Sequence, residues 1–334
     1  MNGRPLPGRH EPRRAYRDAL GLIAVAAGPT LYRSTLVFST TLGATPPPVM
    51  TGFLSHAITL LAGVAGGWWL SQRVEARLAR DTRRQARLHT LVLTLVLAHT
   101  VDSVVPAHGG VSTRLPAAIL MAWLTWEIIR ARGISADAFE TPLGHSPRWA
   151  PAWLAAALAL AAFVATGRLA TGLDGYGPTT PGSQLVLLGL GDTPHPLLLT
   201  ARIVWTSVVE ELVVTAAVIT LLRQARRPVW EWTLLVVAVR VLGHGYLGTP
   251  ALAQIVIGLV AVLLYVRCRG LVPLIAIHIL YDLEPSVPVA AIAAILALAI
   301  HAVYRAATTP APDDPGDGTT ATPDPTAKTH RSLR

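Results

Sequence analysis

The sequence predicts an all-α fold, a polytopic transmembrane helical bundle of about ten spans, with eight as the lower bound and both termini in the cytoplasm. The 334 residues are 52% hydrophobic and only 14% charged, whereas soluble domains carry about 25% charged residues. Because so few charges cannot cover a globule in water, most of the surface must face lipid. Long apolar stretches recur along the chain, and arginines cluster between alternate stretches.

The predicted spans are apolar stretches near the roughly 20 residues that cross about 30 Å of hydrocarbon. In the first half of the chain they cover residues 19–40, 49–70, 88–105, 115–129 and 150–169. In the second half they cover residues 197–222, 229–247, 251–266, 271–283 and 287–304. The chain therefore divides into a basic cytoplasmic N-terminus (1–18), N-terminal membrane helices (19–170), a second membrane domain (197–304) and a C-terminal tail (305–334). The tail is rich in Pro, Thr, Asp and Gly, so we expect it to be disordered.

The placement of arginines sets the expected orientation. Basic residues fill the N-terminus and the connection after the second span, and they return after the fourth, sixth and eighth spans. The loop 171–196, on the opposite side, carries only Asp174 and Asp192 as charged residues besides His195. By the positive-inside rule the basic connections stay in the cytoplasm. Within this pattern, the basic cytoplasmic segment 71–89 is expected to lie as a helix on the anionic inner leaflet.

Charge and cysteine content exclude two classes of protein. The net charge of +9 comes from arginines placed beside apolar spans, which is the pattern of a membrane protein and not of a nucleic-acid-binding one. A single cysteine, Cys268, excludes an internal disulfide framework. We therefore expect a multi-pass protein of the cell membrane whose partners include the lipid bilayer and no nucleic acid.

Ionisable residues inside predicted spans are the strongest functional signal. A charged side chain there costs at least about 3 kcal/mol on insertion scales, so such residues are functional candidates. The second membrane domain holds most of them, namely Arg202, Glu210, Glu211, Arg240, His244, His278, Asp282 and Glu284. The N-terminal spans contribute Arg33, His56, His99, Asp102 and Glu127. The candidate chemistry therefore concentrates on three helices of the second half.

Helical spacing indicates which of these side chains converge. His278 and Asp282 are four residues apart and share a helix face, as do Arg240 and His244. Glu210 and Glu211 point about 100° apart on an α-helix, so both cannot aim at the same spot. One carboxylate is therefore expected to perform chemistry while the other holds helices together.

Two kinds of chemistry remain open for this group of residues. Glu210, His244 and His278 form a ligand set for a divalent metal such as zinc. Alternatively, no metal takes part: a buried carboxylate acts as general base on water, and a histidine donates a proton to the leaving amine. The usual HExxH spacing of zinc peptidases is absent.

The order and spacing of these residues resemble a known family. The run Glu210-Glu211, then His244, then His278-x-x-x-Asp282, each on a separate apolar helix, is similar to the EExxxR, FxxxH and HxxxN/D motifs of the CPBP family, which comprises the type II CAAX prenyl endopeptidases and bacteriocin-processing relatives. The resemblance covers about residues 200–283. It implies an intramembrane endopeptidase in which Glu210 and His244 activate water. It also implies that His278 and Asp282 hold water or stabilise the oxyanion.

Two positions depart from the family motifs. Thr215 stands where the first motif has arginine, and Arg240 stands where the second has phenylalanine. One cation is lost and another is gained one turn before His244. We therefore expect Arg240 to reach across and pair with Glu211, so that the site keeps its charge balance.

Two alternative functions without peptidase activity would involve the same residues. In a proton- or ion-coupled transporter, buried acids and histidines carry the charge, but the paired Gly/Pro interruptions of two matching halves are not visible in this sequence. In a catalytically inactive membrane scaffold, the changes at Thr215 and Arg240 would have abolished hydrolysis. The favoured prediction is hydrolysis of a peptide bond in a membrane-proximal peptide or protein.

Overall fold

The computed structural model describes residues 11–78, 89, 114–134, 150–178, 196–268 and 271–283. Within these residues the chain is helical and contains no strand, which confirms the all-α prediction for this part.

The N-terminal helices are α1 (Glu11–Ala26), α2 (Gly28–Thr41), η1 (Met50–Leu54), α3 (Ser55–Leu78), α5 (Arg114–Ala131) and α6 (Ala150–Leu173). The C-terminal helices are α8 (Pro196–Ser207), η3 (Val208–Ala217), α9 (Val218–Gln224), α10 (Val229–Gly243), η4 (Gly245–Leu247), η5 (Thr249–Ala253), α11 (Gln254–Cys268) and α12 (Leu271–Leu283). The predicted spans 88–105 (but for residue 89) and 287–304, and the tail 305–334, lie outside the described residues.

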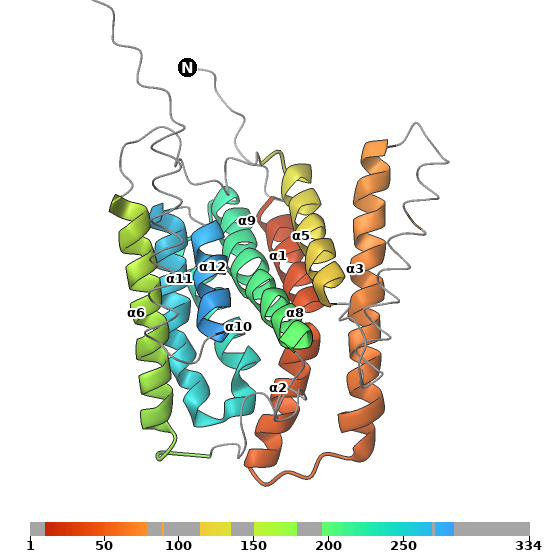
Figure 1. Cartoon of the computed structure of the whole chain (residues 1–334). Helices are drawn as coiled ribbons and strands as arrows, with labels where there is room; N and C mark the ends of the chain where they lie inside the picture. The colour runs from red at the N-terminus through yellow and green to blue at the C-terminus, as the bar shows by residue number, and fades with distance from the viewer. Residues whose placement is uncertain are drawn as a thin grey trace, which may run out of the picture.

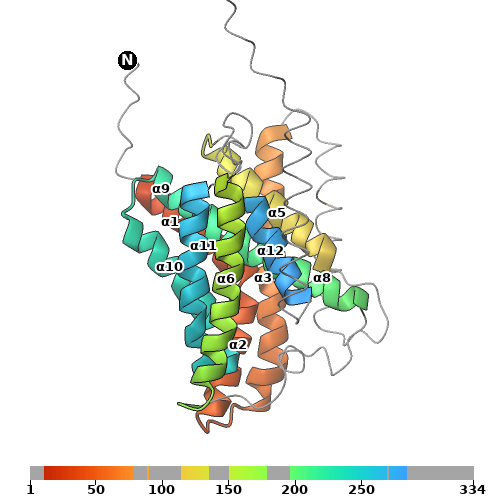
Figure 2. The ribbon, with the colours of Figure 1, turned by 60° about the vertical axis from the view of Figure 1, so that its left-hand side comes forward.

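The helices lie side by side in a bundle, with α8, η3 and α9 running through its middle as one continuous helical path (Figure 1). The view turned by 60° shows α6, α11 and α12 covering one side of this path (Figure 2). Val213, Ala216, Ala217 and Leu222 of the central path are fully buried. Apolar side chains from α1, α5, α10 and α12 belong to the same core. The segment that carries Glu210 and Glu211 is therefore the axis around which the other helices pack.

The first predicted span is not one straight helix. Helices α1 and α2 meet at an angle of 63° across Ala27, where the sequence continues with Gly28 and Pro29. Proline has no N–H to donate and its ring displaces the preceding turn, so it bends or breaks a helix. The predicted span over residues 19–40 therefore consists of parts of two helices joined at an elbow.

The basic segment after the second span also differs from expectation. Residues 71–78 continue α3 without a break, so this part does not form a separate surface helix. The continuous helix is favoured because no glycine or proline interrupts residues 68–78. Residues 79–88 of the same segment lie outside the described residues.

Among the described residues, three helices are long and apolar enough to cross a membrane: Met50–Ala76, Arg202–Gln224 and Thr249–Val266. Counting the bent pair α1 and α2 as one span raises the number to four. The membrane character of the chain is thus supported by length and composition. The count of about ten spans and the orientation of the termini stay predictions.

Charged residues join three helix ends at one end of the bundle. Arg132, just after α5, donates to Asp18 of α1 through Nε at 2.8 Å and also through Nη2. Gln224 at the end of α9 donates to the carbonyl of Arg132 at 3.0 Å, and Arg227 lies over the ring of Tyr16. The arginine-rich ends of α1, α5 and α9 therefore lie together, as expected if all three face the same side of the membrane.

The Asp18–Arg132 ion pair is expected to stabilise the bundle strongly. Asp18 is completely buried, so Arg132→Ala leaves a buried carboxylate without its main cation and lowers the free energy of unfolding by an amount on the order of 3 kcal/mol. The matched control is Arg17→Ala, because Arg17 also approaches Asp18, at 3.7 Å, but is 71% exposed. The thermal unfolding midpoint in detergent should fall for Arg132→Ala and stay near wild type for Arg17→Ala; equal midpoints for the two variants would contradict this account.

Candidate active site

The two adjacent glutamates lie on a π-helical segment, η3 (Val208–Ala217). In such a helix, hydrogen bonds reach five residues back instead of four, and short π segments are frequent at functional sites. The Thr215 hydroxyl also spans five residues, because it donates to the Glu210 carbonyl at 2.8 Å. The angle of 100° per residue that applies to an α-helix therefore does not apply here. Glu210 and Glu211 nevertheless face different partners, Glu210 toward His244 and Glu211 toward His278, as their adjacent positions predicted.

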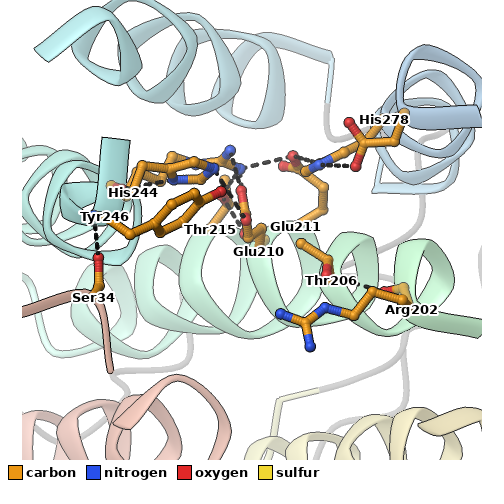
Figure 3. Close-up of polar contacts among 11 residues, drawn as sticks. Ser34, Arg202, Thr206, Glu210, Glu211, Thr215, His244, Tyr246 and His278 are labelled. Carbon is orange, nitrogen blue, oxygen red and sulfur yellow. Dashed lines mark hydrogen bonds and ion pairs between the residues drawn. The ribbon is translucent and has the colours of Figure 1, made fainter. Parts of the chain in front are cut away.

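Glu210 and Glu211, which are labelled in Figure 3, both contact the guanidinium of Arg240, which comes from the last turn of α10. Arg240 Nη1 donates to Glu210 Oε2 at 3.0 Å, and Nη2 donates to Glu211 Oε1 at 2.7 Å. One guanidinium reaches both acids because its donors lie in a rigid planar fork. The expected pairing of Arg240 with Glu211 is thus present, and a second pairing with Glu210 accompanies it.

Arg240 also occupies the place left open by the first motif departure. Its Nη2 lies 3.1 Å from the hydroxyl of Thr215, which is the position where the family motif has arginine. The Arg240 side chain is only 1% exposed, so its charge is neutralised by the two carboxylates and not by water. Arg240 of α10 therefore places a guanidinium directly beside residue 215 of η3, where the family motif has arginine.

His278 of α12 lies between two carboxylates. Its Nδ1 is 2.9 Å from Glu211 Oε1 and its Nε2 is 3.4 Å from Asp282 Oδ2. Because ionised carboxylates only accept hydrogen bonds, an imidazolium with two N–H donors satisfies both contacts. The ring of Phe163 on α6 packs against the imidazole, with ring centroids 5.2 Å apart. The expectation that His278 and Asp282 share one helix face is confirmed.

His244 lies just past the end of helix α10. The helix ends at Gly243, and His244 is its C-terminal cap residue. The imidazole Nδ1 lies 2.9 Å from the carbonyl oxygen of Arg240. Since a carbonyl can only accept, Nδ1 carries the hydrogen, which leaves the Nε2 lone pair available in the neutral ring. Nε2 is 4.0 Å from Glu210 Oε1, a separation too long for a direct hydrogen bond.

Together these contacts form one chain of acids and bases across three helical elements, in the order Asp282, His278, Glu211, Arg240, Glu210 and His244. Its middle is closed to solvent, because Glu211 and Arg240 are 2% and 1% exposed. Its two ends are more open, with His244 16% and Asp282 26% exposed. Chemistry on an external molecule is therefore available at the ends, and the middle serves to hold them.

The donors proposed for zinc do not gather around one point. Glu210 faces Arg240 and His244, whereas His278 faces Glu211 and Asp282. Within the part of the chain that the structure describes, no group of three or more His, Cys, Asp or Glu residues is arranged to hold a metal ion. The guanidinium between the two glutamates would also repel a second cation. The residues present therefore do not fit the tetrahedral metal site that the sequence left open.

Three residues around the site were not found by sequence reasoning. Phe163 packs on His278, Tyr246 lies with its ring centroid 5.9 Å from that of His244, and Ser34 of α2 accepts a hydrogen bond from the Tyr246 backbone. None of them belongs to a motif, and a serine or an aromatic residue in an apolar span carries no functional signal by itself. Only the packing of distant segments brings them to the site.

Part of the chain matches a known protein family. Residues 193–283 match the family model described as type II CAAX prenyl endopeptidase Rce1-like. This match supports CPBP family membership for the matched region. The matched region contains Arg240 and the five candidate acids and bases of the site, which are Glu210, Glu211, His244, His278 and Asp282. Helices α1 to α6 lie before it in the chain. CPBP membership supports a membrane-embedded peptidase in the CAAX-protease-like class. No curated protein and no solved structure matches the chain.

Energetic coupling between Glu211 and Arg240 is the first expected property of this CPBP site. Removing either partner leaves a buried charge, so Glu211→Gln and Arg240→Gln should each destabilise the protein, and the double variant should be more stable than the sum predicts by about 1–3 kcal/mol. Unfolding free energies in detergent measure this double-mutant cycle. A cycle between Glu211→Gln and Arg132→Gln serves as the control, and strictly additive effects in the first cycle would disprove the buried pairing.

Two substitutions test whether Arg240 takes the place of the arginine that the family motif has at position 215. Arg240→Phe restores the family motif at one position and removes the cation, so this single variant should unfold at a lower temperature or fail to accumulate. Adding Thr215→Arg places an arginine at the residue whose hydroxyl lies 3.1 Å from Arg240 Nη2, and most of the lost stability should return. Thermal midpoint and monodisperse yield measure the effect. A double variant no better than Arg240→Phe alone would show that the two positions are not equivalent.

Proposed function

We propose that this CPBP protein is an intramembrane endopeptidase that hydrolyses a peptide bond in a membrane-proximal peptide or protein. The observation that carries the proposal is the placement of Glu210 Oε1 and His244 Nε2. They face each other across 4.0 Å at a partly exposed end of an otherwise buried charge chain. One water molecule hydrogen-bonded to both atoms fits a gap of this size. Such a water is held next to a carboxylate base and an imidazole acceptor.

In the proposed reaction, Glu210 and His244 activate this water. Arg240 holds Glu210 Oε2 at 3.0 Å, which leaves Oε1 to take a proton as the water oxygen bonds to the substrate carbonyl carbon. His244, fixed through Nδ1, orients the water through Nε2. The proton on Glu210 then passes to the amide nitrogen as the C–N bond breaks. The products are a carboxylic acid and an amine, so atoms and protons balance.

The other end of the chain is proposed to stabilise the tetrahedral intermediate. The contact between His278 Nε2 and Asp282 is 3.4 Å, which is longer than the 2.9 Å contact between Nδ1 and Glu211. The Nε2–H is therefore the donor more easily turned toward the negatively charged oxygen of the intermediate. Glu211 keeps the ring oriented through Nδ1, while Asp282 is the more exposed of the two carboxylates and gives up its longer contact to the substrate oxygen.

Placement in the cell membrane as a multi-pass protein belongs to the same proposal. The lipid bilayer and a peptide or membrane protein are the expected partners. A transporter or an inactive scaffold would hold the same buried acids and histidines. What favours hydrolysis is that Glu210 and His244 are partly exposed and open to one molecule, while Glu211 is buried between Arg240 and His278.

Cleavage of a mixed peptide library by purified protein in detergent tests the proposal. Wild type should cleave, and Glu210→Gln should lower the rate by at least about a hundredfold because the general base is lost. Glu231→Gln is the matched control, since Glu231 pairs with Arg227 outside the site, and it should retain activity. A chelator should leave the rate unchanged. No cleavage by folded wild type would contradict the peptidase, and loss on chelation with recovery on zinc would contradict the metal-free mechanism.

A further inference from the structure

The backbone around His244 needs support from outside its own helix. Helix α10 ends at Gly243, and His244 is followed by Gly245 and the short 3₁₀ turn η4. Glycines on both sides of a residue give the chain more conformational freedom than any other pair. His244 itself is held by its N–H, which donates to Arg240 and Val241 carbonyls at 3.1 and 3.2 Å. These bonds and the Nδ1 contact with the Arg240 carbonyl fix the start of the turn. Within the turn, the N–H groups of Leu247 and Gly248 donate to the His244 and Gly245 carbonyls at 2.9 Å, and Thr249 after it donates to the Pro178 carbonyl. None of these bonds attaches the turn to the helix on its α2 side.

A hydrogen bond from a distant helix supplies this support. The backbone N–H of Tyr246 donates to Ser34 Oγ at 2.8 Å, across 212 residues of sequence (Figure 3). Ser34 is 1% and Tyr246 6% exposed, so water does not replace this partner at low cost. The Tyr246 ring lies beside the His244 ring, with centroids 5.9 Å apart. The bond therefore holds the residue whose ring is next to the candidate catalytic imidazole.

The approach of the turn to α2 is close. A Cβ atom placed on Gly245 would lie 3.3 Å from Ser34 Oγ, so glycine at this position lets the turn come near the hydroxyl. Helix α2 is directed here by the 63° elbow after α1. The contact thus joins the family-matched domain to a helix that lies before it in the chain.

We propose that Ser34 is a positioning residue for the candidate active site: its hydroxyl fixes the turn that carries His244, so α2 completes the site. This inference rests on the proposed function for its catalytic consequence, and on geometry alone for the tether. His244 must lie 4.0 Å from Glu210 Oε1 to share a water with it. Loss of the tether lets the turn shift, which misplaces Nε2 while leaving substrate contacts elsewhere unchanged.

Ser34→Ala tests the catalytic consequence. The variant should lower kcat by about ten- to a hundredfold, because small misplacements of a catalytic group have effects of this size, and it should leave KM near the wild-type value. Ser39→Ala is the matched control, since Ser39 lies on the same helix and bonds only its own helix at the Leu36 carbonyl. A merely structural role would lower the amount of folded enzyme without this split. Equal kcat values for the two variants would overturn the proposal.

A second measurement does not depend on activity. Carbethoxylation of histidines, followed by peptide mass spectrometry, reports how accessible each ring is. Ser34→Ala should raise the modification rate of His244 severalfold and leave the buried His278 unchanged, whereas Ser39→Ala should change neither. If wild type cleaves no peptide but this pattern is found, the tether stands and the proposed function fails. An unchanged His244 rate in Ser34→Ala overturns the tether itself.

A disulfide between α2 and the turn that carries His244 should replace the hydrogen bond that Ser34→Ala removes. In a Cys268→Ala background, Ser34→Cys combined with Gly245→Cys places two thiols within bonding reach, because the Cβ of residue 245 approaches the Ser34 side chain to 3.3 Å. Oxidation should restore the low His244 modification rate and the lost kcat, and reduction should remove both. A cross-link that does not form, or that forms without any restoration, would contradict the assigned contact.

Discussion

The guanidinium of Arg240 is the interaction on which the rest of this site depends. It is a buried cation held by two carboxylates of a neighbouring helical element. His244 and His278 each lie next to one of those carboxylates, and Asp282 joins the site through His278. Burying an ion pair is costly and becomes tolerable only when its hydrogen bonds are well made. The cost fixes a single arrangement, because any rotation of α10 against η3 would separate charges in a medium of low polarity. Rigidity of this kind suits a site that must keep two groups poised around one water.

The shape of one guanidinium explains how two adjacent carboxylates of the π-helical segment η3 share a cation. Neighbouring side chains of a helix point in different directions, and Arg240 meets them with separate nitrogens, Nη1 for Glu210 and Nη2 for Glu211. This segment also lies at the centre of the bundle and is packed by helices from both halves of the chain. Chemistry and packing therefore share the same residues, and the wider helix is maintained by tertiary contacts more than by local preference.

The sequence predicted the residues of the site better than their arrangement. Costly charges inside apolar spans identified Glu210, Glu211, Arg240, His244, His278 and Asp282 without a structure, because burial makes ionisable residues informative. The elbow at Ala27, the π-helical segment and the position of His244 beyond the end of α10 were not foreseen. Each depends on contacts between segments far apart in the chain, which hydropathy and spacing do not encode. The tether at Ser34 is invisible for the same reason, since a lone serine in an apolar span has no distinguishing pattern.

The exchange between Thr215 and Arg240 also constrains the evolutionary history of the chain. If an ancestor carried the family's arginine at position 215, two substitutions were needed, and their order matters. Losing the first arginine before gaining the second would leave two buried carboxylates with no cation, which destabilises a protein severely. Gaining Arg240 first would pass through an intermediate with two guanidiniums beside Glu210, Glu211 and, through His278, Asp282, in which cations and acids remain nearly balanced. Gaining Arg240 before losing the arginine at position 215 is therefore the less destabilising order. A homologue that carries both arginines would represent the intermediate of this order.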